Sequence, residues 1–526
     1  MKDSLLFYDE DCDSVTGHAT PGRVKDQVFA WFDYLYSLDI DVIGYVCLNN
    51  DLSFVRDVPS AEKAGDRYST FESMQSWLRV NTLREMWSEG TDTMHLACQA
   101  ARKHDKAILG QMRMSDAHHA QRSEGPGTGT EWLCPKTVYD HPEWRIVKQD
   151  GQKDMLLDYS YSQVREMKLA YLRELAENYD LDGLQLNWMR WCRHFTAAKQ
   201  REKAPTITDF LRDVRHLLDD VGKKKGKRLL LVHQVAAELE ENLDIGCDVA
   251  TWVEAGLADA LQPMDFLHAD FNIRTEQFVE VCRDSDCGVY PTIHRTLGGD
   301  TNNTHRQSAH MTADKFRAIA YNFAAWGAQG CTVYNFCNWG YFETAKEYLE
   351  QAISILASPE AATSGPRYYH FIPIWKWHSS GKMPTGRANS QRLQFRSDEL
   401  GQRLGYTFRM ADGRNGENLK GHLCAWISDA TPQDAFELDL NGTPIDAEAI
   451  HTTFFPIGDD DVRHLKSNPS ESIGARVHQA GLRLEVDLRD CPLFKGDNEL
   501  GVVWTKKNWQ IATDPYMEVL QVYVQK

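Results

Sequence analysis

Short apolar runs alternate with amphipathic stretches along the first two thirds of the chain. Eight such runs lie between residues 5 and 358, at positions 5–9, 42–48, 107–112, 183–188, 229–232, 260–264, 289–293 and 332–336. Stretches with apolar residues at helical spacing follow them, at 21–38, 92–104, 160–178, 208–222, 239–256, 274–284, 312–328 and 342–357. Apolar strands that alternate with helices are typical of a parallel sheet.

The number of units favours a closed barrel over an open sheet. Eight strand–helix units in succession are the pattern of a (β/α)8 barrel. A doubly wound sheet would show a glycine-rich phosphate turn after its first strand, whereas this first strand runs into Asp9, Asp11 and Asp13. We therefore predict a catalytic barrel over residues 1–360, with long insertions at 50–90 and 117–158. Long insertions after barrel strands build the rim of the active site.

The remainder of the chain has a different pattern. After Ser364-Gly365-Pro366 the helical periodicity ends, and turn pairs such as Asn441-Gly442 separate short alternating segments. These segments lie at 392–395, 422–427, 436–440, 482–488, 499–503 and 516–524. They predict an all-β sandwich over residues 366–526. A domain of this kind packs on the flank of a barrel or binds carbohydrate, and the sequence leaves both roles open.

The composition excludes some classes of partner. The formal net charge is −18, whereas phosphate binding needs a basic face, so we expect no nucleic-acid partner. No apolar run approaches the roughly 20 residues that cross a membrane, and the N-terminus carries carboxylates where a signal peptide would be apolar. We therefore expect no membrane partner, while a cytoplasmic, periplasmic or secreted location and assembly into homo-oligomers stay open. The 12 cysteines show no zinc or disulfide spacing, and we expect no metal and no cofactor.

Polar residues follow the strands at one end of the expected barrel, where barrel enzymes carry their chemistry. Strand three ends in Arg113, Asp116, His118 and His119. An arginine at such a position can hold an anion, and a histidine can move a proton near neutral pH. The other strand ends add Asp9, Glu10, Asp11 and Asp13, then Asn49 and Asn50, Asn187, Arg190, Trp191 and Arg193, His233 and Gln234, Asp265 and His268, His294 and Arg295, and finally Asn335, Asn338 and Trp339.

The fourth strand raises the first of three chemistries, glycoside hydrolysis, which usually needs two carboxylates. Residues 181–191 resemble the fourth strand of bacterial glycoside-hydrolase-like barrels, in which an aspartate ends the strand. Here Asn187 stands at that position, and a carboxamide transfers no proton at neutral pH. The usual acid/base pair is therefore incomplete, and a non-catalytic carbohydrate-binding barrel is one alternative.

A metal-dependent hydrolase is a second alternative. Side chains from several strand ends could converge on an ion, namely His118, His233, His294 and Asp265. The chain has no His-X-His on strand one and no His-Glu-X-X-His helix, so no established ligand spacing supports a metal.

The arginines fit the third chemistry, hydrolysis of a sugar acid. Arg113 and Arg190 end adjacent strands and could reach one anion. A sugar acid carries its carboxylate beside the anomeric carbon, so its oxocarbenium-like transition state needs less help from an enzyme carboxylate. Several tryptophans on the rim or at strand ends could pack against sugar faces, namely Trp132, Trp144, Trp188, Trp191 and Trp339. For Trp188 a role in core packing is favoured.

The layout of barrel and sandwich, the Asp-rich end of strand one and the Arg113-X4-His118 pattern resemble the sialidases of glycoside hydrolase family 156. These are inverting exo-sialidases built on a (β/α)8 barrel. The resemblance implies release of a terminal sialic acid, or a similar carboxylated sugar, from a sialoglycan. It also implies an aspartate and a histidine that position the attacking water, and a clamp of two arginines and an asparagine on the substrate carboxylate.

Carried onto this chain, the resemblance assigns the histidine to His118 and the first clamp arginine to Arg113. The second arginine is Arg190, with Arg193 as its alternative. The strand-one aspartate is Asp9, Asp11 or Asp13, of which Asp11 is favoured, and the asparagine is Asn338 or Asn335. Asn187, His119 and Trp191 are expected around the substrate.

Overall fold

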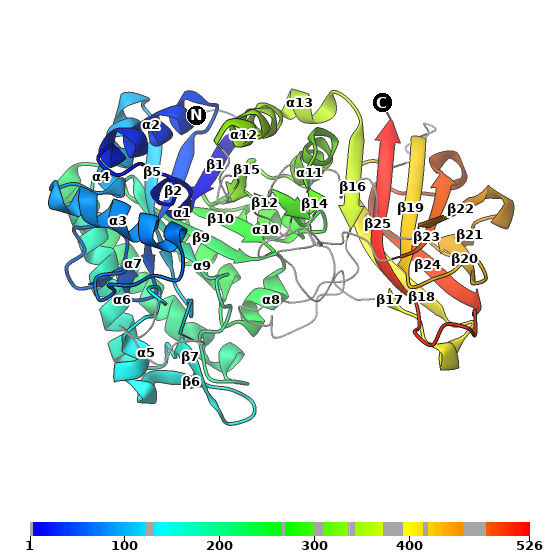
Figure 1. Ribbon diagram of the computed structural model, residues 1–526, viewed down its shortest axis with the longest axis horizontal. Coiled ribbons are helices and arrows are strands. Elements are labelled where there is room, and N and C mark those ends of the chain that lie inside the picture. The colour runs from blue at the N-terminus through cyan, green and yellow to red at the C-terminus, as the bar shows by residue number, and fades with distance from the viewer. Residues whose placement is uncertain are drawn as a thin grey trace.

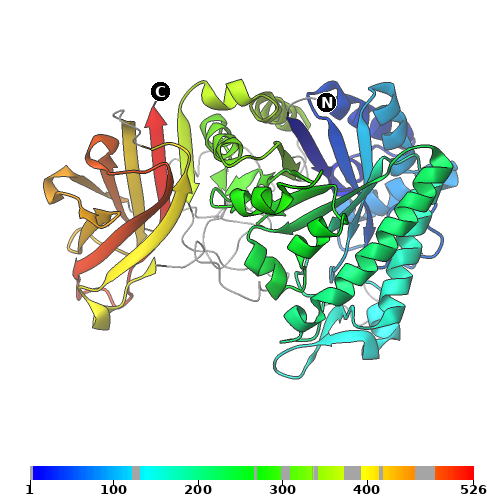
Figure 2. The same ribbon diagram turned by 180° about the vertical axis from the view of Figure 1, so that it is seen from behind.

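The computed structural model describes residues 4–120, 131–265, 269–297, 309–334, 336, 342–371, 393–413, 419–455 and 480–525. A part built of helices and strands lies beside a part built of sheets (Figure 1). Seen from behind, helices surround the strands of the first part on its outer side (Figure 2).

The strands of the first part close into a ring. They are β1 (Leu5–Glu10), β2 (Val42–Asn49), β5 (Ala107–Arg113), β8 (Gly183–Asn187), β9 (Leu230–Ala236), β10 (Ala260–Met264), β11 (Gly288–Val289) with β12 (Thr292–His294), and β15 (Gly330–Tyr334). All pair in parallel, and β1 lies between β2 and β15, which itself pairs with β12. Strand seven is split into β11 and β12 at Tyr290 and Pro291, because proline lacks the N–H that a ladder needs. The predicted (β/α)8 barrel is confirmed.

Helices lie at the predicted positions between the strands. They are α2 (Val24–Ser37), α4 (Thr93–Lys103), α6 (Ser162–Asn178), α7 (Gln200–Lys225), α8 (Leu239–Asp244), α9 (Val249–Glu254), α10 (Thr275–Cys282), α11 (Ala313–Ala325) and α12 (Phe342–Leu356). The stretch predicted as one helix at 239–256 forms α8 and α9 instead, with Gly246 between them at φ 87°. Strand five also runs past its predicted end, so His233 and Gln234 lie within β9.

The predicted insertions carry short elements of their own. Those after β2 are β3 (Leu52–Ser53), β4 (Glu62–Lys63) and α3 (Met74–Ser88), and those after β5 are α5 (Thr137–Asp140), β6 (Arg145–Val147) and β7 (Lys153–Leu157). The remaining short elements are α1 (Asp13–Thr16), β13 (Thr296–Leu297), β14 (Ala309–His310), α13 (Pro359–Thr363), and single turns of 3-10 helix at Pro142–Trp144, Ser397–Glu399, Ala447–Ala449 and Leu488–Asp490.

The barrel interior is built in layers, because side chains two residues apart on a strand share a face. One layer is apolar and contains Phe7, Val42, Leu109, Val232, Ala260 and Tyr290. The next, here called the amide layer, contains Asp9, Gln111, Gln185, Gln234 and Gln262. Gln185 Nε2 donates to Asp9 and to Gln262 at 2.7 and 2.5 Å, reaching strands that do not neighbour its own. Gly44 makes room for this layer, since a Cβ there would lie 1.8 Å from the Gln185 oxygen.

The second part forms two antiparallel sheets, as the sequence predicts for a sandwich. One contains β16 (Arg367–Phe371), β17 (Leu393–Gln394), β19 (Lys420–Ser428), β22 (Ile450–Phe455), β23 (Gly481–Asp487) and β25 (Tyr516–Gln525), and the other contains β18 (Arg403–Met410), β20 (Ala435–Leu440), β21 (Thr443–Pro444) and β24 (Gly496–Lys506). Sequence analysis did not identify β16, β18, β21 and β22.

The sandwich packs on the flank of the barrel next to α10 and α11. Asn322 of α11 donates to the backbone oxygens of Phe271 and Arg409 at 3.1 and 3.0 Å. The Asn272 oxygen accepts the Arg409 N–H at 2.8 Å. These buried amides join the two parts through specific hydrogen bonds, which favours one fixed arrangement.

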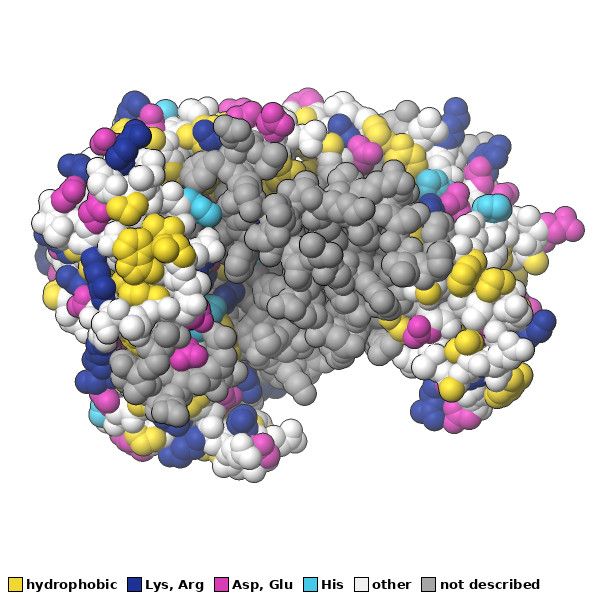
Figure 3. All heavy atoms as spheres, viewed as in Figure 1, with side chains coloured by type: hydrophobic (Ala, Val, Ile, Leu, Met, Phe, Trp, Pro, Cys, Tyr) yellow, Lys and Arg dark blue, Asp and Glu magenta, His cyan; other side chains and the backbone are white. Residues whose placement is uncertain are grey.

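The described surface contains charges of both signs. On the face drawn in Figure 3, Lys and Arg side chains alternate with Asp and Glu side chains and form no basic patch. Within the described residues, every helix is too short or too polar to cross a lipid bilayer.

Candidate active site

The carboxyl ends of the barrel strands bring several of the predicted residues together. Arg113 at the end of β5 is the register partner of both Asn49 and Asn187. Asp9, which precedes Asp11 by two residues, is the register partner of Tyr334 at the end of β15. Strands one, two, three, four and eight therefore contribute to one centre above the amide layer.

Two arginines and two aspartates form the charged part of this centre. Arg113 Nη2 donates to Asp11 Oδ2 at 2.5 Å, and its Nη1 lies 3.9 Å from Asp116 Oδ2. Arg190 Nε lies 3.6 Å from the same Asp116 oxygen. Burial would raise the pKa of Asp11, but the charges of Arg113 and Arg190 outweigh it and hold that pKa below its usual range. Two cations thus face two carboxylates in a buried site.

His118 is held between these groups. Its Nδ1 lies 2.7 Å from Asp116 Oδ1, which also accepts the His118 backbone N–H at 2.7 Å. Its Nε2 lies 2.7 Å from Arg190 Nη2. A guanidinium only donates, so Nε2 must be the accepting nitrogen and Nδ1 must carry the proton to Asp116.

The electrostatics agree with a neutral imidazole. Burial, together with Arg190 and Arg113, lowers the pKa of His118 to about 4, although Asp116 acts in the opposite direction. Burial would raise the pKa of Asp116, but the hydrogen bond from His118 and the charges of Arg190 and Arg113 outweigh it and lower that pKa to about 2. The His118 side chain is still 25% exposed, so a small molecule can reach it. A neutral, oriented and accessible imidazole is the form that a general base requires.

The turn after strand four supports this arrangement. Trp191 has φ 49°, and its ring packs edge-on against His118 with centroids 4.7 Å apart. The Arg190 guanidinium lies 5.3 Å from the same ring. A bulky residue at positive φ is strained, and here the turn places Arg190 and Trp191 around His118.

Two of the predicted residues point elsewhere. His119, at φ 61°, accepts the Leu133 N–H on Nδ1 at 3.2 Å, and its Nε2 lies 3.9 Å from Glu72. Arg193 forms an ion pair with Asp154 at 2.9 Å. His119 therefore links the two insertions, and Arg190 rather than Arg193 accompanies Arg113.

Asn187 occupies the position of the carboxylate expected on strand four. Its Oδ1 accepts the Met189 N–H at 2.9 Å and shapes the turn that leads to Arg190. Its Nδ2 is buried and lacks a hydrogen-bond partner within the described part of the chain. The asparagine thus presents a donor, not an acid, beside Arg113.

The strand-one candidates lie at different depths. Asp11 reaches the arginines, whereas Asp9 lies in the amide layer and accepts from Gln185 and Gln234. Burial raises the pKa of Asp9 to about 7. The Asp13 side chain, Asn335 and Asn338 lie outside the described residues, as do His268 and Trp339.

Tyr334 and Lys168 also belong to the centre, although sequence analysis did not select them. The Tyr334 ring lies 4.6 Å from that of His294, and its buried hydroxyl has no partner among the described residues. Alternate residues of β15 share a face, so counting two residues on from Thr332 would have identified Tyr334. Lys168 of α6 donates to Asn50 Oδ1 at 3.0 Å, and the Asn50 N–H reaches the Arg113 carbonyl at 3.2 Å.

Several buried polar groups in this centre lack partners within the described ranges, and three of them are Arg113 Nε, Asn187 Nδ2 and the Tyr334 hydroxyl. An unsatisfied buried polar group costs about 1–3 kcal/mol. All three can donate a hydrogen bond. A ligand rich in acceptor oxygens would satisfy them, and a carboxylated sugar is such a ligand.

Two of the predicted tryptophans and one predicted metal ligand, His233, lie away from this centre. Trp132 and Trp188 are buried in the core. His233 contacts the Leu257 carbonyl and the Trp188 N–H at 2.9 and 3.3 Å and faces the helices. Over the ranges that the structure describes, His, Cys, Asp and Glu side chains form no group of three that could hold a metal ion.

No protein-family model matches the chain, and no curated protein matches it in sequence. Among solved structures it is similar to alpha-L-fucosidase isoenzyme 2 from Paenibacillus thiaminolyticus (TM-score 0.41, 13% identity, covering 74% of this chain and 55% of the fucosidase). It is also similar to a glycoside hydrolase family 18 N-acetylglucosaminidase from Paenibacillus barengoltzii (0.37, 13%, 66% and 98%). A third is the alpha-L-fucosidase from Vibrio sp. strain EJY3 (0.38, 10%, 99% and 96%). Similarities this distant identify no activity, and the strand pairing itself establishes the barrel.

Proposed function

We propose that the protein is a glycoside hydrolase that releases a terminal carboxylated sugar, of the sialic acid class, by direct attack of water. The observation that carries the proposal is the position of His118, between Asp116 and Arg190 and beside a second guanidinium, that of Arg113.

The two arginines are suited to bind the substrate carboxylate. Guanidinium groups are planar, permanently charged and bind carboxylates through paired hydrogen bonds. Arg113 keeps one buried donor, Nε, without a partner in the described residues. Asp11 and Asp116 balance the two charges, so an incoming carboxylate takes over part of an existing ion-pair network.

The same binding step would release the base. In the free protein the lone pair of His118 Nε2 accepts from Arg190. A substrate carboxylate that binds Arg190 draws this donor away and leaves Nε2 free to accept from water. Water then attacks the anomeric carbon, His118 takes the proton, and Asp116 stabilises the imidazolium.

The bonds balance with one water consumed. The oxygen of water forms the new bond to the anomeric carbon, the bond to the aglycone oxygen breaks, and this oxygen takes a proton from solvent. A single displacement inverts the anomeric configuration. The carboxylate next to the anomeric carbon stabilises the oxocarbenium-like transition state, so Asn187 is compatible with catalysis at this site.

An aryl sialoside tests the proposal directly. We expect hydrolysis by the wild-type protein, with inversion seen by NMR of the first product. Replacing His118 with alanine should reduce kcat by about 10²–10⁴-fold, the usual contribution of a general base. Aryl fucosides and aryl N-acetylglucosaminides are the control substrates, since they lack the carboxylate.

The pH profile gives a second readout. Because the base must be unprotonated, kcat/KM of the wild-type protein should fall as the pH decreases through about 4, the pKa of His118.

Equal turnover of the neutral glycosides would refute the carboxylate clamp. Binding of sialic acid without any hydrolysis would favour the non-catalytic carbohydrate-binding barrel.

A further inference from the structure

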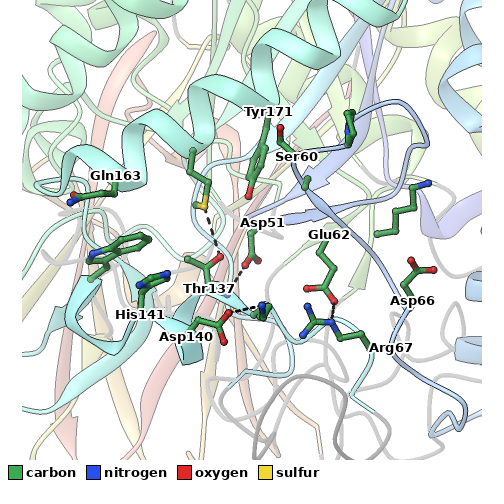
Figure 4. A pocket seen from close by; sticks show the side chains of 16 residues that line it. Asp51, Ser60, Glu62, Asp66, Arg67, Thr137, Asp140, His141, Gln163 and Tyr171 are labelled. Carbon is green, nitrogen blue, oxygen red and sulfur yellow. Dashed lines mark hydrogen bonds and ion pairs between the residues drawn. The ribbon is translucent and has the colours of Figure 1, made fainter.

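A concave site lies beside the barrel mouth. It has a volume of about 830 Å³ and is formed by the segment after β2, by α5 and by the first half of α6. Figure 4 shows these elements enclosing it, with Asp51, Thr137 and Glu62 at its centre. We call it the side groove. A cavity of this size is typical of sites for small molecules.

Two of the three cations that line the side groove are paired with carboxylates, and the third contacts an aromatic ring. Arg67 Nε pairs with Glu62 at 2.6 Å, and Lys136 Nζ pairs with Asp140 at 2.8 Å. Lys63 Nζ lies over the Trp87 ring, 5.2 Å from its centroid. An anionic ligand would have to displace these partners, so the groove does not favour an anion.

Two acceptors in the groove lack a hydrogen-bond partner among the described residues, Asp51 Oδ1 and Glu62 Oε2. Asp51 is buried, and its Oδ2 accepts the Thr137 N–H at 2.8 Å. Its Oδ1 has no hydrogen-bond partner in the part of the chain that the structure describes. Figure 4 shows the carboxyl group directed into the groove. Leaving such an atom unsatisfied is costly, and a ligand that donates a hydrogen bond would satisfy it.

An aromatic platform forms one wall of the groove. The rings of His141 and Trp144 stack with centroids 3.7 Å apart and planes 9° apart. Tyr171 of α6 also lines the cavity. Flat apolar surfaces beside a few oriented acceptors match a molecule with C–H faces and many hydroxyl groups, which is a neutral sugar.

The side groove adjoins the candidate active site. Asp51 follows Asn50, whose N–H donates to the Arg113 carbonyl at 3.2 Å. We propose that the side groove binds neutral sugar residues of the glycan that carries the terminal acidic sugar. The inference rests on the proposed function for its link to the substrate, but binding in the groove can be measured without any hydrolysis.

The test uses lactose, a neutral disaccharide, as the probe. Titration calorimetry or ligand-observed NMR on the full chain should detect lactose binding, and Trp144→Ala should weaken it at least fivefold. Asp51→Asn is the milder second variant, since it keeps the size of the side chain but replaces the unused acceptor with a donor, and should also weaken binding. Trp509→Ala, which removes a tryptophan that is 74% exposed on the sandwich, is the matched control and should bind lactose as wild type does.

A kinetic comparison links the groove to the substrate. Trp144→Ala should lower kcat/KM for sialyllactose at least fivefold and leave that for an aryl sialoside unchanged. Three results would overturn the inference. They are no detectable binding of lactose, equal lactose binding by Trp144→Ala and wild type, and weaker lactose binding in Trp509→Ala alone. Lactose binding that depends on Trp144 in a protein that hydrolyses no sialoside would refute the proposed function alone.

Discussion

Two buried Arg–Asp pairs in this molecule have opposite surroundings. Where the barrel meets the sandwich, Arg367 donates to both oxygens of Asp412 at 2.6 and 2.5 Å. The Tyr369 hydroxyl donates to the same carboxylate at 2.7 Å, and the Arg367 guanidinium lies 4.3 Å from the Tyr321 ring. At the barrel mouth, Arg113 makes one hydrogen bond to Asp11 and keeps Nε without a partner in the described residues.

The difference separates a structural ion pair from one suited to binding. A bidentate pair with all its hydrogen bonds made fixes the positions of the groups around it, and no capacity remains for a ligand. The barrel-mouth pair is incomplete, carries a second guanidinium next to it, and lies beside a partly exposed histidine. Both pairs are buried and join one arginine to one aspartate, so the unused donors distinguish the site from the structural pair.

The largest effect is expected on stability, at the interface pair. Replacing Arg367 with methionine leaves Asp412 buried and unpaired, and should lower the free energy of unfolding by about 3–5 kcal/mol. Because the pair lies away from the strand ends, kcat/KM of the folded protein should not change. Denaturant unfolding and sialoside hydrolysis on the same sample measure both quantities.

A double variant checks the cause of this loss. Arg367→Met combined with Asp412→Leu removes both charges and should recover part of the stability, since an uncompensated charge is the main cost. A double variant less stable than Arg367→Met would show that packing around Arg367 matters more than the charge.

The matching substitution at the barrel mouth should act on activity. Arg113→Met removes one of the two groups proposed to bind the substrate carboxylate, and kcat/KM for an aryl sialoside should fall about 10²–10³-fold, as for loss of one key electrostatic donor. KM should rise and kcat should fall, because the contact is made in both ground and transition states. Equal activity per folded molecule in Arg113→Met and Arg367→Met would remove the distinction between the pairs.

The sequence predicted the barrel well because its signal is local. Apolar strands and amphipathic helices alternate with the correct periods, and each of the eight strand positions was found. In the sandwich, β18 was missed although it alternates, with Tyr406, Phe408 and Met410 buried and the residues between them more exposed. β22 reads Ile-His-Thr-Thr-Phe-Phe and offers no such alternation. The single stretch predicted at 239–256 is two helices, since one glycine at positive φ ends the helical geometry.

The candidate site was only partly predictable. Positions at strand ends correctly brought Arg113, Arg190 and His118 together, because strand order fixes which ends meet. The partner of His118 is Asp116 rather than Asp11, a detail set by turn geometry that no spacing rule encodes. Tyr334 was missed because the predicted strand eight ended two residues later, which moved attention to residues beyond it.

The next largest expected effect is on stability, and it comes from Asp9 in the amide layer beneath the site. Burial raises the pKa of Asp9 from 3.8 to about 7, so between these values the folded protein holds a proton that the unfolded chain has lost. Stability should therefore fall as the pH rises through this window and level off above about 7. Asp9→Asn cannot ionise and should remove about 2.5 kcal/mol of this fall between pH 4.5 and 6.5. Denaturant unfolding of both proteins at the two pH values measures the difference.

The change in stability between the two pH values is compared in wild type and Asp9→Asn. This difference cancels the contributions of other groups that titrate in this range, such as His118 and His233. Asparagine can remain hydrogen-bonded because Gln234 Oε1 has no partner within the described residues and can accept once its amide turns. An identical pH dependence in both proteins would place the Asp9 carboxylate in an ionised state throughout, and thus in contact with water or a cation.

The smallest effect should come from the Tyr334 hydroxyl. Tyr334→Phe removes a buried group that has no partner in the described structure, so stability should stay constant or rise by up to about 1 kcal/mol. If this hydroxyl donates to the bound sugar, kcat/KM for the sialoside should fall about tenfold, the value of one hydrogen bond. Tyr45→Phe is the control, because Tyr45 packs edge-on against Phe32 of α2 with centroids 5.4 Å apart and should leave activity unchanged. Loss of stability with full activity in Tyr334→Phe would make this tyrosine a counterpart of the Arg367 pair, a group whose bonds are complete within the protein.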